Sequence, residues 1–349
     1  MKGKALTFPT MIRTKITISF VYRLTKKFAS SLRRKRFQNI HKKGRPQFYS
    51  DALFLTMLLV RQIYGYSYRE TLQAIKNELK LKSLPALSTS HYRLKKMPTS
   101  LIIEFHKFFV KWMLSKLPDQ IDFIIADGTG FSYNDLYPMK FHRGEEVRHI
   151  RSHVKVCAMI GVLKLGGKRI LLGLKDGGAY ASEVRMVMDA LLQLEQILGV
   201  QATDIPFVAD KGYDSIRVIE RVMEMGLVPE IKVRESWRHE VRNELREISK
   251  SNVESKDSKY KNRYLVESFF GTVKSKLGSH IYAKREDMAR KEALARVIVW
   301  NIYVMVDILN FLHFFIKKLF HDKFKRWFRG NLEMQSMGAT GGSILANFY

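Results

Sequence analysis

The sequence predicts an α/β fold in which short apolar strands lead into acidic turns. Two segments carry most of this prediction: residues 121–126 run directly into Asp127, and residues 205–209 run directly into Asp210. Each is a short apolar run without helical spacing, which is typical of a buried strand. Both acids are therefore expected at the carboxyl ends of strands, where α/β sheets place their chemistry.

The other elements follow these strands in a regular order. In chain order we expect strands 121–127, 154–163 and 169–175, helix 182–198, strand 205–210, helix 214–225 and strand 227–233. Asp214 is expected to cap the second of these helices, because Asp is a favoured N-cap residue. Ser182 is expected to cap the first, with Glu183 in its first turn. A charged connection completes the segment, and periodicity alone supports no class finer than α/β.

A proline-free stretch further on carries four polar residues at helical spacing: Tyr260, Arg263, Glu267 and Lys274. In a helix each residue advances by about 100°, so all four project within roughly one 60° sector. The opposite side is apolar and carries Val266, Phe269, Phe270, Val273 and Leu277. We therefore expect a helix that packs on the core and presents the polar row outward.

Glu267 alone could not support metal-assisted phosphoryl transfer. Such chemistry needs hard oxygen ligands, usually two or three carboxylates. Asp127 and Asp210 are the best partners, because both follow apolar strands. The sequence thus predicts a site for divalent cations beside a phosphodiester, built from three acids that are remote along the chain.

At these residues the chain resembles the DDE transposases of bacterial and archaeal insertion sequences. The polar row matches the Y-x2-R-x3-E-x6-K signature of that family at every position. Asp-Lys-Gly-Tyr-Asp at 210–214 resembles its second-aspartate motif, and Asp-Gly-Thr at 127–129 resembles the first. Spacings of 83 and 57 residues between the three acids fit compact members without a large inserted domain. The resemblance covers roughly residues 45–310.

The resemblance implies an RNase H-like mixed sheet flanked by helices, and DNA cleavage followed by strand transfer. Asp127, Asp210 and Glu267 are then the catalytic and metal-binding residues, holding two Mg²⁺ (or Mn²⁺) ions per site. Tyr260, Arg263 and Lys274 are expected to bind DNA phosphate. The implied partners are double-stranded DNA, as the terminal inverted repeats of the element and as target, and a second copy in a homodimer. ATP is not expected, since the sequence contains no Gly-x4-Gly-Lys-Ser/Thr motif.

Composition points to the same class of partner. Lys and Arg number 61 against 33 Asp and Glu, which gives a net charge of +28 and implies a polyanion. A membrane surface is the competing polyanion, but the basic residues are interleaved with polar positions throughout. The most apolar stretch, residues 297–315, is broken by polar residues and is expected to be a buried helix. With Cys157 alone no intramolecular disulfide forms, and we expect a cytoplasmic, nucleoid-associated protein.

The N-terminal part is basic and then helical. Residues 1–50 contain 14 Lys or Arg and no acid, which indicates either an arm that orders on DNA or a solvated tail. Helices are expected from residue 50 to Gly65, from Ser67 with a capping box to Glu70, and from residue 88 onward. Three helices with a basic third one resemble a helix-turn-helix, in which Arg93, Lys95 and Lys96 would contact DNA. The alternative is that these helices only brace the catalytic domain.

Together these features divide the chain into four parts: a basic arm 1–45, a helical DNA-binding region with a helix-turn-helix-like character 46–118, an RNase H-like catalytic domain 119–315, and a basic helix with a flexible tail 316–349. Three functions remain open at this point. The first is an active transposase, which the complete acid set favours. The second is a transposase-derived DNA-binding regulator without cleavage activity, and the third is a stand-alone RNase H-like nuclease that cuts without joining.

Overall fold

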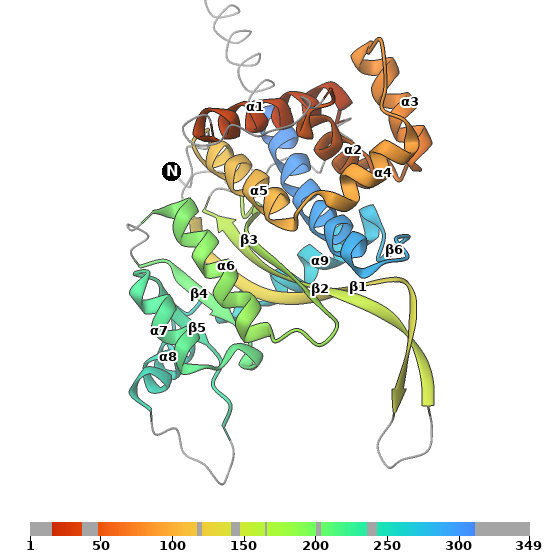
Figure 1. The fold of residues 1–349 in the computed structure, drawn as a ribbon. Helices are drawn as coiled ribbons and strands as arrows, with labels where there is room; N and C mark the ends of the chain where they lie inside the picture. Colours follow the sequence, from red (N-terminus) through yellow and green to blue (C-terminus); the bar gives the residue numbers. More distant parts are fainter. Residues whose placement is uncertain are drawn as a thin grey trace, which may run out of the picture. The chain divides into compact units, whose positions relative to one another are not determined.

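The computed structural model describes residues 16–36, 48–116, 121–140, 147–164, 166–199, 204–235 and 243–310 (Figure 1). The chain separates into two compact units, residues 1–304 and 305–349, and the elements below belong to the first, apart from residues 305–310 at the end of the last described helix. The basic helix and tail expected at 316–349 lie outside the described residues. The domain boundaries expected at 45, 118 and 315 stay predictions.

A mixed sheet forms the centre of the first unit. Its strand order is β3-β2-β1-β4-β5, with β6 (His280–Ile281) pairing on β1. β1 (Ile121–Lys140), β2 (Val147–Leu163) and β3 (Arg169–Gly178) are antiparallel, whereas β4 (Pro206–Ala209) and β5 (Val228–Ile231) continue the sheet in parallel with β1. This arrangement of three antiparallel strands followed by parallel crossovers confirms the predicted RNase H-like fold.

The first two strands are much longer than predicted. β1 was expected to end at Asp127, but it pairs with β2 as far as Lys140, opposite Val147, with a register shift between Ser132 and Leu136. Phe131 and Tyr133 remain buried beyond the expected end. In Figure 1 the two strands run on past the rest of the sheet as a ribbon. Asp127 therefore lies inside a strand, at the level where only its parallel neighbour β4 ends.

The edge strand β3 is held by side-chain amides. Asn301, on the helix of residues 286–310, accepts from the Leu171 N–H at 2.8 Å and donates to the Leu171 carbonyl at 2.7 Å. Gln193, on α6 (Glu183–Leu198), makes the same pair of bonds to Leu174 at 3.3 and 2.7 Å. Each amide thus occupies the position of a neighbouring strand on the backbone groups of β3.

The predicted N-terminal helices are present as α2 (Asp51–Tyr64), α3 (Tyr68–Leu79) and α4 (Leu87–Lys96), followed by α5 (Thr99–Leu114). The capping box between Ser67 and Glu70 is confirmed. α1 (Ile18–Arg36) departs from the expected arm, because its apolar side packs inward and Thr25 hydrogen-bonds Thr56 of α2 at 2.7 Å. Val21 and Phe28 of α1 are buried, and Phe28 contacts Phe105 of α5 edge-on. One side of α1 is therefore packed into the core.

Buried charged groups tie these helices to the helix of residues 286–310. Arg61 of α2 pairs with Glu292 at 2.6 Å, and both side chains are almost fully buried. Lys291 donates from Nζ to the carbonyls of Leu94 and Lys95 at 3.1 and 2.6 Å. A lysine thus satisfies carbonyls in the last turn of α4, where cations are favoured. These contacts support bracing of the fold by α2 to α4 and leave DNA recognition untested.

The chain after β4 also differs from the prediction. It first makes a 3-10 turn, η1 (Lys211–Tyr213), so α7 (Ile216–Glu224) begins later than expected and Ser215, not Asp214, is its N-cap. The buried Asp214 carboxylate instead accepts from the Arg234 N–H at 2.8 Å and from Arg246 Nη2 at 2.6 Å. Arg246 lies on α8 (Glu244–Glu254), a helix inside the segment that was expected to be a charged connection.

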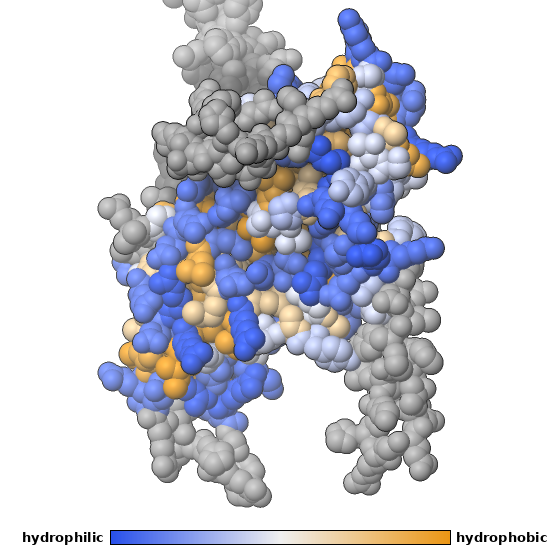
Figure 2. Space-filling view, viewed as in Figure 1, coloured by the Kyte–Doolittle hydropathy of each residue, from blue (hydrophilic) through white to orange (hydrophobic). Residues whose placement is uncertain are grey.

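Figure 2 shows hydrophilic side chains over most of the described surface on this face, with apolar side chains gathered near α6 and α7. The exposed apolar residues there include Leu192, Ile216 and Met223. In the described part of the chain, no helix combines the length and apolar character needed to cross a membrane.

Candidate active site

Asp127 and Asp210 lie on neighbouring parallel strands at the same level. Ala126 of β1 and Ala209 of β4 are partners in the register, and each aspartate is the next residue in its chain. Adjacent strands in a sheet are about 4.8 Å apart, so the two carboxylates start from neighbouring backbone positions. The structure thus brings together the two aspartates that the sequence selected.

Asp127 is mostly buried, and few neighbouring groups compensate its negative charge. Its Oδ1 accepts from the Gly128 N–H at 2.7 Å, and its side chain is 22% exposed. Burial raises its pKa from 3.8 to about 6, against the lowering effect of that hydrogen bond. The value of about 6 also includes the negative charge of Asp210, which raises this pKa, and the positive charge of Arg263, which lowers it. A carboxylate in this position would gain from a nearby cation.

Asp210 sits at the start of η1 and accepts from the Gly212 N–H at 2.6 Å. A methyl group on Gly212 would lie 2.8 Å from Asp210 Oδ1, which is too close for an ordinary contact. A side chain at residue 212 would therefore require the Asp210 carboxylate to shift. Tyr213 of the second-aspartate motif is fully buried, with its hydroxyl 4.0 Å from the sulfur of Cys157.

The polar row expected on one helix is divided between two elements. Tyr260 lies in a 3-10 turn, η2 (Tyr260–Asn262), Arg263 follows it, and α9 (Tyr264–Leu277) carries Glu267 and Lys274. The helix therefore begins four residues later than the spacing suggested. On its inner side Val266, Phe269, Phe270 and Val273 are buried as predicted, whereas Leu277 is only partly buried.

Arg263 links the helix to the strand of the first aspartate. It donates from Nη2 to Glu267 Oε1, and its Nη1 lies 4.0 Å from Asp127 Oδ2. Glu267 is the more exposed of the two acids, with 56% of its side chain accessible. The third acid thus faces the same region as Asp127, with a guanidinium between them.

Lys274 and Tyr260 take different positions. The Lys274 ammonium lies 5.5 Å from the centre of the buried Phe131 ring, and burial lowers its pKa. Burial raises the pKa of the Tyr260 phenol, which Arg263 lowers and Asp210 raises. Tyr260 therefore lies within electrostatic reach of both. A side chain added to Gly271 would meet no atom within 4 Å, so no close approach inside the described chain requires glycine there.

Two anchors hold this helix and its preceding turn. Arg169 of β3 donates from Nη1 to the Leu265 carbonyl at 3.2 Å and to Ser268 Oγ at 2.9 Å. The buried Glu230 of β5 accepts from Ser258 Oγ at 2.9 Å, just before η2. The sequence gives no signal for Arg169 or Glu230, because neither lies in a motif and their contacts arise only from packing.

The donor set at this edge of the sheet suits a hard divalent cation, since it consists of carboxylate oxygens. As the side chains stand in the described residues, no three His, Cys, Asp or Glu are grouped closely enough to hold a metal ion. The Arg263 guanidinium instead provides positive charge to Glu267 and, at longer range, to Asp127.

A fourth acid near the aspartates was not selected as a functional residue. Glu183, in the first turn of α6, lies beside both Gly128 and Gly212 and pairs with Lys155 of β2 at 3.1 Å. Its only signal in the sequence is an acid at the start of a helix that follows a strand. That pattern is common, because the N-terminal turn of a helix favours negative charge.

The residues predicted to recognise DNA lie on α4 and differ in their surroundings. Arg93 pairs with Asp51 at 2.6 Å and lies 4.7 Å from the centre of the Phe54 ring. Lys95 and Lys96 are exposed. Arg93 thus has a role within the fold, whereas the two lysines are accessible to a partner.

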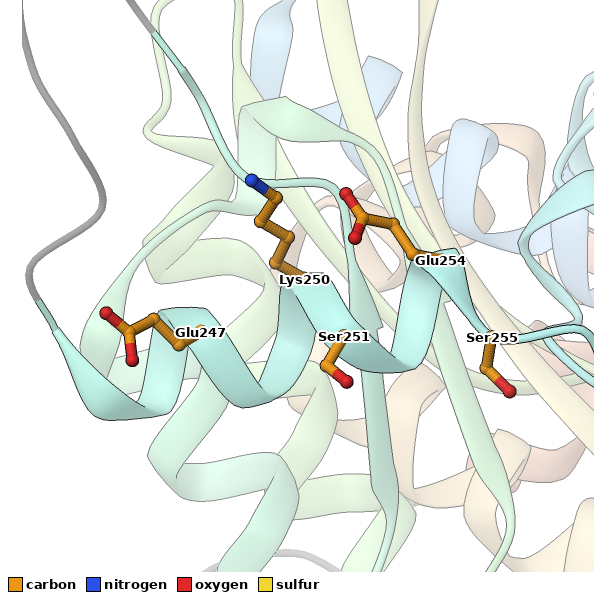
Figure 3. Close-up of a pocket in the computed structure, with 5 residues that line it drawn as sticks. All are labelled: Glu247, Lys250, Ser251, Glu254 and Ser255. Atoms are coloured by element: carbon orange, nitrogen blue, oxygen red, sulfur yellow. The ribbon is translucent and has the colours of Figure 1, made fainter.

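A hollow on the surface lies apart from these residues. It is lined by Glu247, Lys250, Ser251 and Glu254 of α8 and by Ser255, the residue after this helix (Figure 3). None of the predicted site residues lines it.

The fold and the paired aspartates define an RNase H-like domain with carboxylates at the junction of its antiparallel and parallel strands. Comparison of the sequence with known families gives a match to the Transposase DDE domain over residues 118–302. The chain belongs to this transposase family.

One relative and two solved structures show the extent of the similarity. An uncharacterized protein of Aquifex aeolicus (strain VF5) is 30% identical over 272 residues, which are 77% of this chain and 82% of that protein. A piggyBac transposase synaptic complex with hairpin DNA matches 88% of this chain and 78% of its own, at 10% identity and a TM-score of 0.39. The Mos1 mariner paired-end complex with Mn matches 84% and 89%, at 11% identity and a TM-score of 0.23.

Proposed function

We propose that this transposase binds the ends of an insertion sequence and catalyses metal-dependent DNA cleavage and strand transfer. The observation that carries the proposal is the register of β1 and β4, which sets Asp127 and Asp210 side by side. Burial together with the charge of Asp210 raises the pKa of Asp127 to about 6, as expected for an acid that meets a cation in its working state.

Asp127, Asp210 and Glu267 are the residues that would hold Mg²⁺ or Mn²⁺, two ions per site. Such ions, when bound, supply Lewis-acid stabilisation of the charge that develops on the phosphodiester oxygens. The two aspartates come from rigid strands, and Glu267 comes from a helix anchored on β3 by Arg169. For Glu267 to join the aspartates, its ion pair with Arg263 must open.

Release of Arg263 from Glu267 would free a cation for DNA. Its planar guanidinium suits bidentate binding of a phosphate, and Lys274 and Tyr260 lie on the same segment as further phosphate ligands. Arg263, Lys274 and Tyr260 would then position the scissile phosphate against the acids. The reaction exchanges one phosphodiester for another, so it requires no ATP.

The proposed partners are the terminal inverted repeats of the element, target DNA, and a second copy of the chain that holds the other end. Lys95 and Lys96 of α4 are proposed to contact the repeat, together with Arg93 if its ion pair with Asp51 opens. Since α4 is joined to the helix of residues 286–310 through Lys291, a bound DNA end would keep a fixed geometry relative to the sheet.

The test uses the full chain and a supercoiled plasmid that carries the genomic sequences flanking the gene. With Mg²⁺ present, the wild type should nick and join this plasmid, and Asp127→Ala should bind it equally well without nicking. Nicking by Asp127→Ala at the wild-type rate would refute the assignment. The control is Asp122→Ala. Asp122 is an acid on the same strand as Asp127, and it pairs with Lys259 at the surface.

Other outcomes separate the alternatives. Specific binding without nicking by the wild type would favour a regulator derived from a transposase. Nicking without joining would favour a stand-alone nuclease.

A further inference from the structure

Glu183 lies between the two segments that carry the aspartates. A methyl group built on Gly128 would lie 3.9 Å from Glu183 Oε1, and one built on Gly212 would lie 3.5 Å from Glu183 Oε2. Gly128 directly follows Asp127, and the Gly212 N–H binds Asp210. The carboxylate of Glu183 therefore bridges the gap between both aspartate motifs, although it comes from a third element, α6.

Glu183 Oε2 and Asp210 Oδ1 both lie close to the same point beside Gly212. The same methyl position on Gly212 that lies 3.5 Å from Glu183 Oε2 lies 2.8 Å from Asp210 Oδ1. The two carboxylate oxygens thus border one small volume. No side chain fills that volume from residue 212, because residue 212 is glycine.

Charge shows the same proximity. Glu183 is one of the three charged groups that act on the pKa of Asp127, which it raises together with Asp210. The compensating cation is Lys155, whose ammonium lies 3.1 Å from Glu183 Oε1. Lys155 engages one oxygen of Glu183, and the other oxygen faces Gly212.

We propose that Glu183 is a further carboxylate ligand of the divalent cation held by Asp127 and Asp210, and that Lys155 competes with the cation for it. This inference rests on the proposed function, because it assumes that the two aspartates hold the ion. The competing explanation is purely structural: Glu183 would serve the N-terminus of α6 and its ion pair with Lys155, with no contact to a metal.

The two explanations predict opposite signs for changes at Lys155. If Glu183 is a ligand, Glu183→Gln should weaken binding of Mn²⁺ to the full chain by about 10- to 100-fold. Lys155→Met should strengthen it, because the competing cation is gone and Glu183 is released. If the pair is only structural, neither substitution should change the affinity for Mn²⁺ beyond its matched control.

Matched controls are present on α6 and on β3. Glu195→Gln removes an acid of similar exposure that pairs with Arg221, and Lys175→Met removes a strand lysine that pairs with Asp189. Neither control residue borders the aspartates. Affinity would be measured without DNA, by the loss of the electron paramagnetic resonance signal of free Mn²⁺ on titration with protein. Circular dichroism spectra would verify that each variant is folded.

Asp127→Asn and Asp210→Asn separate this inference from the proposed function. Both should weaken Mn²⁺ binding, and if neither does, the proposed metal site itself is wrong. If both do while Glu183→Gln matches Glu195→Gln, the aspartate site stands and the role of Glu183 is overturned. A decrease in affinity for Lys155→Met would also overturn it.

Discussion

Arg263 Nη1 lies 4.0 Å from Asp127 Oδ2, so a residue from the signature segment already reaches the strand of the first aspartate. The same guanidinium binds Glu267. One arginine therefore touches two of the three acids that were selected from distant parts of the sequence.

The first prediction concerns the shape of this cation. Arg263→Lys keeps the charge but loses the planar fork, so DNA affinity should change little while the nicking rate falls on the order of tenfold to a hundredfold. Nicking of the flanking-sequence plasmid and fluorescence anisotropy of a labelled end would measure the two effects. Arg285→Lys, at an exposed arginine paired with Asp287, should change neither quantity. Equal losses of affinity and rate would instead indicate a role in binding alone.

The second prediction concerns the stability that the folded chain loses when Asp127 is ionised. Its folded-state pKa of about 6 exceeds the usual 3.8, so the folded chain loses stability as the pH rises from 3.8 to about 6, and the full loss is present above pH 6. At pH 8 Asp127→Asn should therefore raise the free energy of unfolding by about 2 to 3 kcal/mol. The gain should disappear near pH 4, where the carboxyl is largely protonated in the folded state and partly so in the unfolded chain.

Thermal unfolding in the presence of a chelator, at pH 8 and at pH 4, would measure this difference. Asn can still accept from the Gly128 N–H, so the hydrogen bond is kept. Asp122→Asn serves as the surface control. A melting temperature that falls at pH 8 would contradict the account.

The third prediction concerns His106, which is fully buried on α5. Its Nε2 donates to the Leu171 carbonyl at 3.1 Å, its Nδ1 has no partner, and burial lowers its pKa from 6.5 to about 4. A lowered pKa means that the unfolded chain binds the proton more tightly. Stability is therefore fully present above pH 6.5 and is lost as the pH falls toward 4.

Between these pH values the loss due to His106 should be about 3 kcal/mol. His106→Leu should remove that share of the pH dependence, and Asn301 still satisfies the Leu171 carbonyl at 2.7 Å. Urea unfolding at several pH values would measure the slope, with the exposed His91→Leu as control. An unchanged slope in His106→Leu would show that the loss of stability in acid comes from other groups.

The fourth prediction tests the observed role of Asp214. An N-cap contributes about 1 kcal/mol, whereas removal of one partner from a buried ion pair costs about 3 to 5 kcal/mol. Asp214→Ala should show the larger loss in chemical denaturation, and Ser215→Ala should lose less than about 1 kcal/mol, since its side chain makes no capping hydrogen bond. In a double-mutant cycle with Arg246→Met, the double variant should lose less stability than the sum of the two single losses.

The fifth prediction separates the roles of the cations on α4. Lys95→Ala and Lys96→Ala should each reduce the salt dependence of DNA binding by about one phosphate equivalent, with no change in melting temperature. Arg93→Ala should lower stability by about 1 kcal/mol, because it loses Asp51 and the Phe54 ring. If the lysine variants bind DNA as the wild type does at all salt concentrations, α4 serves only to brace the fold.

The sequence predicted the strands of the two aspartates because their apolar runs are short and end in acidic turns. Their pairing followed from the family resemblance. The sequence did not predict the length of β1 and β2. Residues 128–140 mix glycine, proline and polar residues, so whether they form a strand is decided by pairing with a partner strand. Glu183 was missed as a functional residue for a related reason: its position beside Gly128 and Gly212 depends on how α6 packs on the sheet. The start of α9 was misplaced because 3-10 and α-helical turns share nearly the same spacing over four residues.

The amides of Asn301 and Gln193 on β3 have a consequence for assembly. Bare strand edges invite chains to join edge to edge, and here the backbone groups of Leu171 and Leu174 are already engaged from within. A second copy of the protein would have to displace both amides before it could lengthen the sheet at this margin. Growth into sheet-like aggregates from β3 is therefore disfavoured.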